Sequence, residues 1–145
     1  MFQATVTLDL DSFVHALDGI AMRVQDLHPL LEDIGQVMKA STEANFEGER
    51  EPSGLQWKDL KKSTVERRTR RGTWPGQILT ETGTLRESMG VFIGPDYVEI
   101  GTNVPYGKYH MTGTTRMPAR PFLGIPGDKS TLAEVINSHF SNISV

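Results

Sequence analysis

The chain of 145 residues contains no cysteine. This absence excludes a disulfide framework, zinc sites built on thiolates and cysteine nucleophiles. No stretch approaches 18 consecutive apolar residues, so we expect no helix that spans a membrane. The first residues also lack a basic region followed by an apolar run, and we therefore expect no signal peptide.

Recognisable catalytic and metal-binding motifs are missing as well. The segment Gly101–Lys108 resembles a phosphate loop, but five residues instead of four separate its glycines, and Tyr109 stands where a hydroxyl that binds magnesium belongs. None of the four histidines has metal-ligand spacing, and no GxSxG elbow occurs. We therefore expect no enzyme, no metal and no cofactor. A small hydrolase built on His110 and a distant acid is the third-ranked alternative.

The composition is that of a folded protein. Apolar residues make up 37% of the chain and charged residues 23%, which favours a packed core over disorder. A length of 145 residues suits one domain, and we assign residues 1–145 to a single domain.

The net charge of −3 conceals a strong asymmetry. Residues 1–51 contain ten acidic and three basic residues, whereas residues 58–71 contain seven basic and two acidic ones. Opposite charges on one small protein suit head-to-tail self-association or contact with a polyanion, although a charged run can also be ordinary solvated surface. The basic residues that we select as interaction candidates are Lys61, Lys62, Arg67, Arg68, Arg70 and Arg71.

Hydrophobic periodicity predicts the elements of the first half of the chain. Alternation predicts a strand over Gln3–Leu8. Apolar residues at helical spacing then predict two consecutive helices, the first after a cap at Asp9 or Asp11 and the second from Pro29 to about Phe46. A short basic helix is expected over Ser63–Arg70, ended by a glycine.

The second half predicts shorter elements. A helix is expected over Thr82–Met89, where Thr84 and Glu87 have the spacing of a capping box. A hairpin and a last helix complete the set, over Val91–Ile93, Tyr97–Gly101 and Asp128–Ser141. The expected fold class is α+β, with a small, mostly antiparallel sheet flanked by two N-terminal helices and a C-terminal helix.

The segment Ile100–Leu123 is the most informative part of the chain. It is rich in glycine, threonine and proline, yet it carries more large apolar groups than a solvated linker would hold. Two prolines bar its second half from a helix interior or a central strand. We therefore expect a long ordered loop with a function in binding. The aromatic and basic candidates for contact, here and in the preceding turn, are Trp74, Tyr106, His110, Arg120 and Phe122.

Three motifs carry a resemblance to a known family. They are ILTETGTLRESM over Ile78–Met89, IGTNVPYGKYH over Ile100–His110 and PARPFLG over Pro118–Gly124. In this order and spacing, the chain resembles the phage virion morphogenesis family, which includes the tail completion proteins of P2-like and Mu-like phages. The resemblance covers roughly residues 25–140. The sequence departs from the family pattern at Thr112, where an aromatic residue is more typical, and in the arginine-dense run Arg67–Arg71.

The resemblance implies a structural virion protein without catalysis. It implies a neck- or tail-terminator-like fold and a function in completing the tail or joining head to tail, through a homo-oligomeric ring for which six copies is the usual tail symmetry. The implied partners are other phage tail or neck proteins, with transient contact to DNA and none to a membrane. The implied location is the virion, and the host cytoplasm during assembly. The alternative function is a nucleic-acid-binding module that uses residues 58–71.

Overall fold

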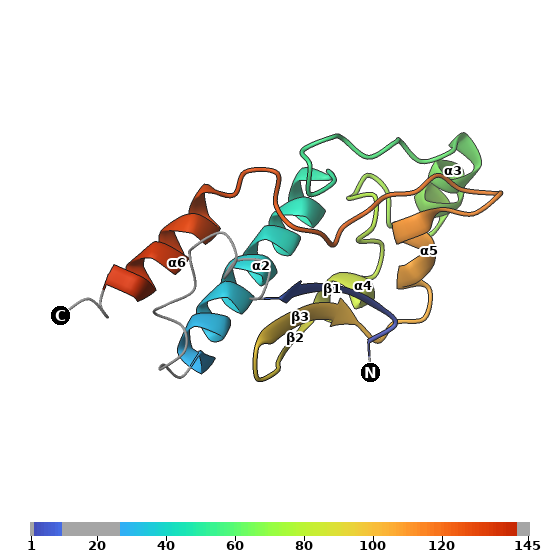
Figure 1. The fold of residues 1–145 in the computed structure, drawn as a ribbon. Coiled ribbons are helices and arrows are strands. Elements are labelled where there is room, and N and C mark those ends of the chain that lie inside the picture. Colours follow the sequence, from blue (N-terminus) through green and yellow to red (C-terminus); the bar gives the residue numbers. More distant parts are fainter. Residues whose placement is uncertain (1, 10–26, 142–145) are drawn as a thin grey trace.

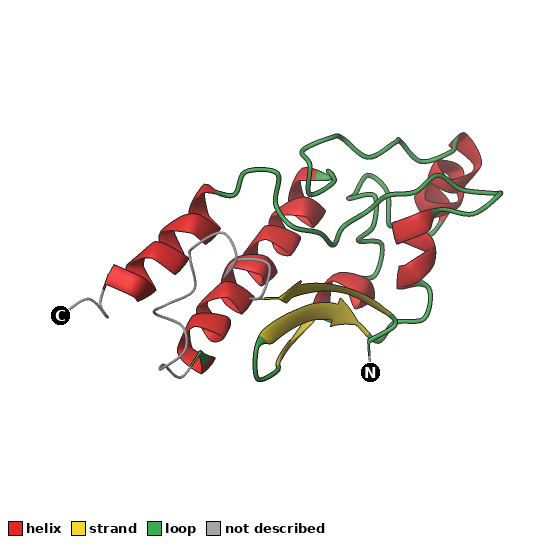
Figure 2. Cartoon of the chain, in the orientation of Figure 1, coloured by secondary structure: helices red, strands yellow, loops and turns green. Residues whose placement is uncertain are grey.

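The structure is a computed structural model, and it describes residues 2–9 and 27–141. A small sheet lies against the long helix α2, α6 lies beside α2, and α3 and α5 lie together at one end of the molecule (Figures 1 and 2). The predicted α+β class is confirmed. The elements are β1 (Ala4–Asp9), α2 (His28–Gly48), α3 (Lys62–Arg70), α4 (Thr84–Glu87), β2 (Gly90–Ile93), β3 (Tyr97–Thr102), α5 (Gly107–Thr112) and α6 (Ser130–Ser141).

The sheet has three antiparallel strands in the order β1-β3-β2. The hairpin of β2 and β3 confirms the prediction for residues 91–101, and β1 adds to the other side of β3, with Val6 opposite Ile100. Alternate residues of each strand point to opposite faces. Val98 and Ile100, which we expected in the core, are each 1% exposed. Their face of the sheet packs against α2, while Phe92 on the other face is 51% exposed.

Helix α2 approaches the sheet closely because a glycine faces it. A Cβ atom at Gly35 would lie 2.8 Å from Val91 Cγ1 and 3.3 Å from a Val98 methyl carbon. The apolar stripe of α2 is buried on the sheet at this point, and α6 packs on α2 through Leu132 and Ile136. Both helices confirm their predicted positions, with ends within two residues of those expected.

Two further predictions concern the capping box at Thr84 and the first N-terminal helix. The capping box at Thr84 is wrong, because α4 has Gly83 as its N-cap, in the left-handed region at φ 82°, and no side chain caps the helix. Glycine tolerates this conformation without the steric cost that a side chain would add. The first N-terminal helix that we predicted falls on residues 10–26, which lie outside the described part of the chain.

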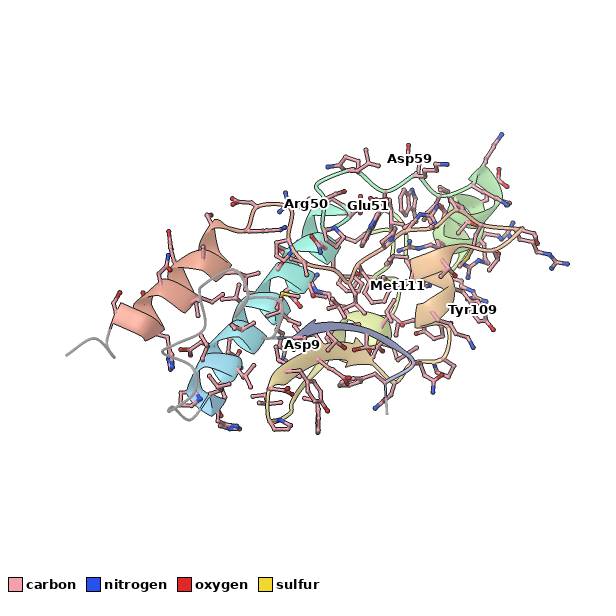
Figure 3. All side chains as sticks on the ribbon, viewed as in Figure 1. Asp9, Arg50, Glu51, Asp59, Tyr109 and Met111 are labelled. Carbon is pink, nitrogen blue, oxygen red and sulfur yellow. The ribbon has the colours of Figure 1, made fainter. Side chains whose placement is uncertain are left out.

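The segment after β3 is ordered, as predicted, but it includes a helix that we did not predict. Helix α5 occupies the interval between Pro105 and Pro118, where neither ring interrupts a helical hydrogen bond. Gly107 allows this helix to pack closely, since a Cβ there would lie 2.8 Å from Thr102 Cγ2. Met111 faces the interior and its sulfur accepts a hydrogen bond from the Phe122 amide at 3.4 Å, whereas Tyr109 faces outward and is 46% exposed (Figure 3).

The close contact at Gly35 predicts a large cost for any branched side chain there. Gly35→Val should lower the free energy of unfolding by about 1–3 kcal/mol, because overpacking against β2 and β3 outweighs the small gain in helix propensity. Ala40→Val, on the exposed side of the same helix, is the matched control and should cost less than about 1 kcal/mol. Urea denaturation measures both, and equal losses at the two positions would contradict the packing argument.

Candidate functional site

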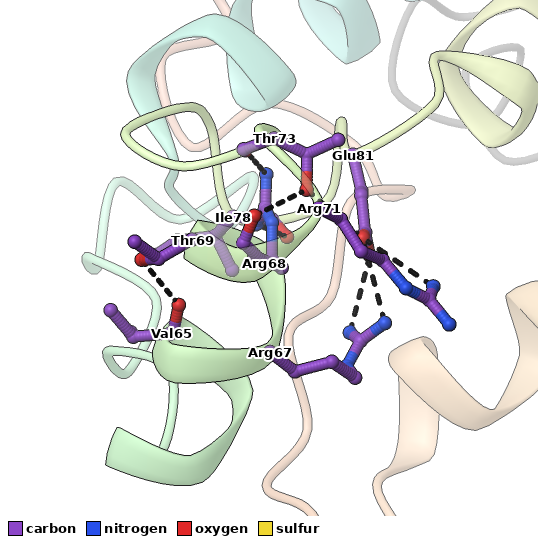
Figure 4. A network of polar contacts seen from close by, with 8 residues as sticks. All are labelled: Val65, Arg67, Arg68, Thr69, Arg71, Thr73, Ile78 and Glu81. Atoms are coloured by element: carbon purple, nitrogen blue, oxygen red, sulfur yellow. Dashed lines mark hydrogen bonds and ion pairs between the residues drawn. The ribbon is translucent and has the colours of Figure 1, made fainter.

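The basic segment forms helix α3, but its central arginine points inward. Arg68 is 1% exposed, and its guanidinium donates hydrogen bonds to the carbonyl oxygens of Thr73 at 3.1 Å and Ile78 at 3.4 Å (Figure 4). It also lies over the Trp74 ring, 5.2 Å from the ring centre, which is a cation–π distance. Arg68 therefore holds the 73–78 turn against α3 and is a structural residue.

Two further arginines of α3 and its C-terminus meet one carboxylate. Glu81 lies 3.2 Å from Arg67 Nη2 and 4.0 Å from Arg71 Nη1, and it accepts a hydrogen bond from the Thr73 hydroxyl at 3.1 Å (Figure 4). Desolvation alone would raise the pKa of Glu81. The hydrogen bonds from Thr73 and Arg67, with the charges of Arg67 and Arg68, outweigh desolvation and hold that pKa below its ordinary value.

Helix α5 and the segment that follows it face α3. Arg120 is 5% exposed and donates to the carbonyl oxygens of Lys58 at 2.8 Å and Asp59 at 2.9 Å, which joins the segment to the start of the basic region. Lys61 Nζ donates to the Arg116 carbonyl oxygen. Burial, and after it the charge of Arg120, lowers the pKa of His110, so the imidazole is neutral near pH 7.

These elements enclose a cleft of about 760 Å³ between α3, the 78–85 segment, α5 and the 114–120 segment. Its walls combine apolar side chains such as Leu60, Leu79 and Met117 with charged ones. Among the described residues that line the cleft, Glu81 is the one carboxylate. The cations that line this cleft are Lys61, Arg67, Arg68, Arg116 and Arg120. The five cations outnumber the one carboxylate, so the described lining carries a strong excess of positive charge, to which a neutral His110 adds nothing.

The cleft gathers six of the eleven interaction candidates, which the sequence places up to 59 residues apart. They are Lys61, Arg67, Arg68, Tyr106, His110 and Arg120. Lys62, Arg70 and Arg71 lie on the exposed outer side of α3 and at its end. Trp74 is half-buried under Arg68.

The selection of Phe122 as a contact residue is wrong. Its side chain is fully buried, 5.2 Å from the Phe46 ring centre, because the chain segment carrying it completes the core beside α2. The prediction that Arg68 and Arg120 contact a partner is corrected in part, because their guanidinium groups donate hydrogen bonds to carbonyl oxygens of the same chain. What they contribute to the cleft is positive potential and shape.

Three of the residues that line the cleft without having been candidates are Glu81, Arg116 and Met117, which give it charge or apolar surface. Glu81 was missed because a single acid in ILTETG has no motif of its own, although its position shortly after an arginine run was an available signal. Arg116 and Met117 were missed because the loop conformation that brings them to α3 depends on distant hydrogen bonds.

The hydrolase alternative requires an acid that orients His110. In the described part of the chain, His110 Nδ1 has no hydrogen-bond partner, so no carboxylate–histidine pair is formed there. Among residues 2–9 and 27–141, no three histidine, aspartate or glutamate side chains are grouped as metal ligands. None of the helices described is both long enough and apolar enough to cross a membrane.

Comparison with known proteins identifies the family. The model of the phage virion morphogenesis family matches residues 8–141, and the chain belongs to that family. It is similar to "Mu-like prophage FluMu G protein 1" of Haemophilus influenzae, with 33% identity over 125 residues that cover 84% of this chain and 85% of the relative. It is also similar to "Putative capsid assembly protein G" of Escherichia phage Mu, with 29% identity over 148 residues, covering 96% and 93%. No solved structure matches the chain. The protein therefore has a structural role in phage morphogenesis.

The lowered pKa of Glu81 predicts a pH dependence of stability. A carboxylate whose pKa is lower in the folded state contributes stability above its unfolded pKa, near 4.3, and this contribution is lost as the pH falls through the folded value. The native chain should therefore be more stable than Glu81→Gln at pH 7, and the difference should shrink as the pH is lowered below about 4. Urea denaturation at several pH values measures it.

The control for this measurement is Glu87→Gln, at an exposed glutamate of α4. Its effect on unfolding should be small at every pH. A difference between native chain and Glu81→Gln that is constant across the pH range would contradict the assigned interaction.

Proposed function

We propose that this protein completes the phage tail, or joins head to tail, by assembling with copies of itself into a ring. The family and the two relatives support a role in virion morphogenesis, and ring formation is the further step. In this proposal the protein works by surface contact without catalysis. It is made in the host cytoplasm, contacts neighbouring tail or neck proteins, and remains in the virion.

The observation that carries the proposal is the separation of opposite charges along the molecule. Helices α3 and α5 lie at one end, and the start of α2 lies at the other (Figure 1). The α3 end exposes cations, including Lys62 and Arg70, and the start of α2 exposes Glu32 and Asp33. A contact between two different surfaces of the same protein repeats from copy to copy and closes when the rotation permits. Charges at such a contact set its register and speed of docking.

Exposed aromatic side chains on the same end support a contact there. Tyr106 is 44% exposed and Tyr109 is 46% exposed, both on or beside α5. Tyrosine and arginine are enriched at the centres of protein interfaces. The cleft and its rim therefore have both the charge and the residue types of a docking surface.

Self-assembly predicts a multimer whose formation depends on salt. Light scattering of the purified protein should give a mass that is a multiple of 16.1 kDa at low ionic strength, and the multimer should weaken as salt screens its charge pairs. Electron microscopy of the multimer should show rings. If the free protein is monomeric, it should assemble on tails that lack it. A monomer that also fails to bind such tails would contradict the proposal.

The exposed cations of α3 keep nucleic-acid binding as a second candidate. Retention on heparin and on DNA, measured over a range of salt concentrations, tests it, because each phosphate contact adds to the dependence of affinity on salt. We expect weak binding with a shallow slope. Tight binding with a steep slope, in a protein that stays monomeric, would favour the nucleic-acid function instead.

A further inference from the structure

We propose that the cationic cleft is the acceptor half of the contact between copies, and that it receives the β2–β3 turn of a second copy of this chain. This inference rests on the proposed function, and it assigns the two surfaces that meet. The cleft is lined by five cations and one carboxylate, together with apolar side chains. It therefore suits a segment that presents a carboxylate flanked by apolar groups.

The turn between β2 and β3 has this chemistry. Pro95 and Asp96 are exposed at its tip, and Phe92 at its base is 51% exposed, which is high for a phenylalanine. In the described part of the chain, the Asp96 carboxylate has no hydrogen-bond or ion-pair partner. A free acid beside two exposed apolar residues is the complement of the cleft.

The turn is also narrow and fixed in shape. The amide of Gly94 donates to the Tyr97 carbonyl oxygen at 2.8 Å, which closes the turn. The Tyr97 ring lies so close to Gly94 that a Cβ atom there would clash with it. A preorganised projection loses little conformational entropy on docking.

The β2–β3 turn and the cleft lie too far apart in one molecule for the turn to enter the cleft of its own chain. Strand β3 begins at the turn, and its last residue, Thr102, leads directly into the segment of α5 that lines the cleft. Six residues of strand separate them by about 20 Å. The turn of one copy can therefore reach only the cleft of another, as a chain of identical contacts requires.

Nucleic acid fits the cleft less well. A phosphate entering beside Arg67 would meet the carboxylate of Glu81, which is 3.2 Å from that arginine. Leu60, Leu79 and Met117 would face the sugar–phosphate backbone without a polar partner. One cation is nonetheless free for a partner, since the guanidinium of Arg116 is exposed and has no hydrogen-bond or ion-pair partner among the residues described.

Exchanging the charges of Arg116 and Asp96 tests whether these two side chains pair between copies. Arg116→Glu and Asp96→Arg should each weaken assembly at least about tenfold, because each places like charges together. The double variant restores an opposite pair and should recover assembly to within about threefold of the native chain. Lys129→Glu, at an exposed cation just before α6 that does not line the cleft, is the matched control and should assemble normally.

Cross-linking provides a measurement that does not depend on charge. The chain has no cysteine, so Asp96→Cys combined with Arg116→Cys introduces the only thiols. A short bismaleimide should convert this variant into a ladder of covalent multimers, while Lys108→Cys with Arg116→Cys should not. Circular dichroism of each variant establishes that it is folded.

The outcomes separate this inference from the proposed function. Native protein that assembles, with Arg116→Glu assembling equally well and no ladder formed, would overturn the assignment of the cleft and leave ring assembly standing. Loss of assembly in Arg116→Glu without recovery in the double variant, and again no ladder, would overturn the turn as occupant. In that case Glu32→Arg and Asp33→Arg identify the start of α2 as the other half. Native protein that never assembles would contradict both proposals.

Discussion

The cleft depends on how the segment after α5 is fastened to the end of α2. The Phe122 ring packs beside Phe46, which also contacts Trp57 edge-on at 5.9 Å between ring centres. Polar bonds then fix the backbone at the same place, since Trp57 Nε1 donates to the Pro121 carbonyl oxygen at 2.7 Å and Asn45 donates to that of Phe122 at 3.1 Å. This fastening acts together with the hydrogen bonds of Arg120 and Lys61, which hold the 114–120 segment beside the start of α3. The packing of Phe122 against the end of α2 thus helps to position the loop that lines the cleft.

A second constraint acts inside the cleft, where like charges must be held together. Five cations around one space repel each other, and the cost falls when carbonyl oxygens and a carboxylate partly neutralise them. The two Nη atoms of Arg68 and the guanidinium of Arg120 donate to backbone carbonyl oxygens, whereas Arg68 Nε has no hydrogen-bond partner among the residues described. Glu81 interacts with Arg67 and Arg71. The Arg86 guanidinium is likewise held, by Glu43 and Glu47 on α2, outside the cleft. The result is a positive surface on which most of the guanidinium groups have oxygen partners from the same chain.

The sequence predicts the parts of this structure that depend on periodicity and misses those that depend on distant contacts. The stripe of α2, the hairpin and α6 were predictable because each buries a regular apolar pattern. Helix α5 is only six residues long, so its pattern is too short to detect, and the capping residue of α4 is a glycine, not the threonine that motif spacing favours. We selected the interaction candidates by residue type. This choice identified several of the cations of the cleft, but it could not show which of their side chains point inward. Burial of Phe122 and Arg68 follows from tertiary packing that no local pattern encodes.

Whether the basic side chains of residues 58–71 point into the protein or into solvent decides how well this segment can bind DNA. Residues 58–71 have seven basic side chains, yet Arg68 is buried and Arg67 and Arg71 interact with Glu81. A protein that makes about six to ten phosphate contacts binds DNA with a steep dependence on salt, and the described surface of α3 offers fewer free cations than that. In the proposed ring between head and tail, strong nonspecific binding would oppose the passage of DNA. The ion pairs of Arg67 and Arg71 with Glu81 leave fewer cations free for DNA. They also fix the shape of the cleft, and a fixed shape favours complementary contact between protein surfaces.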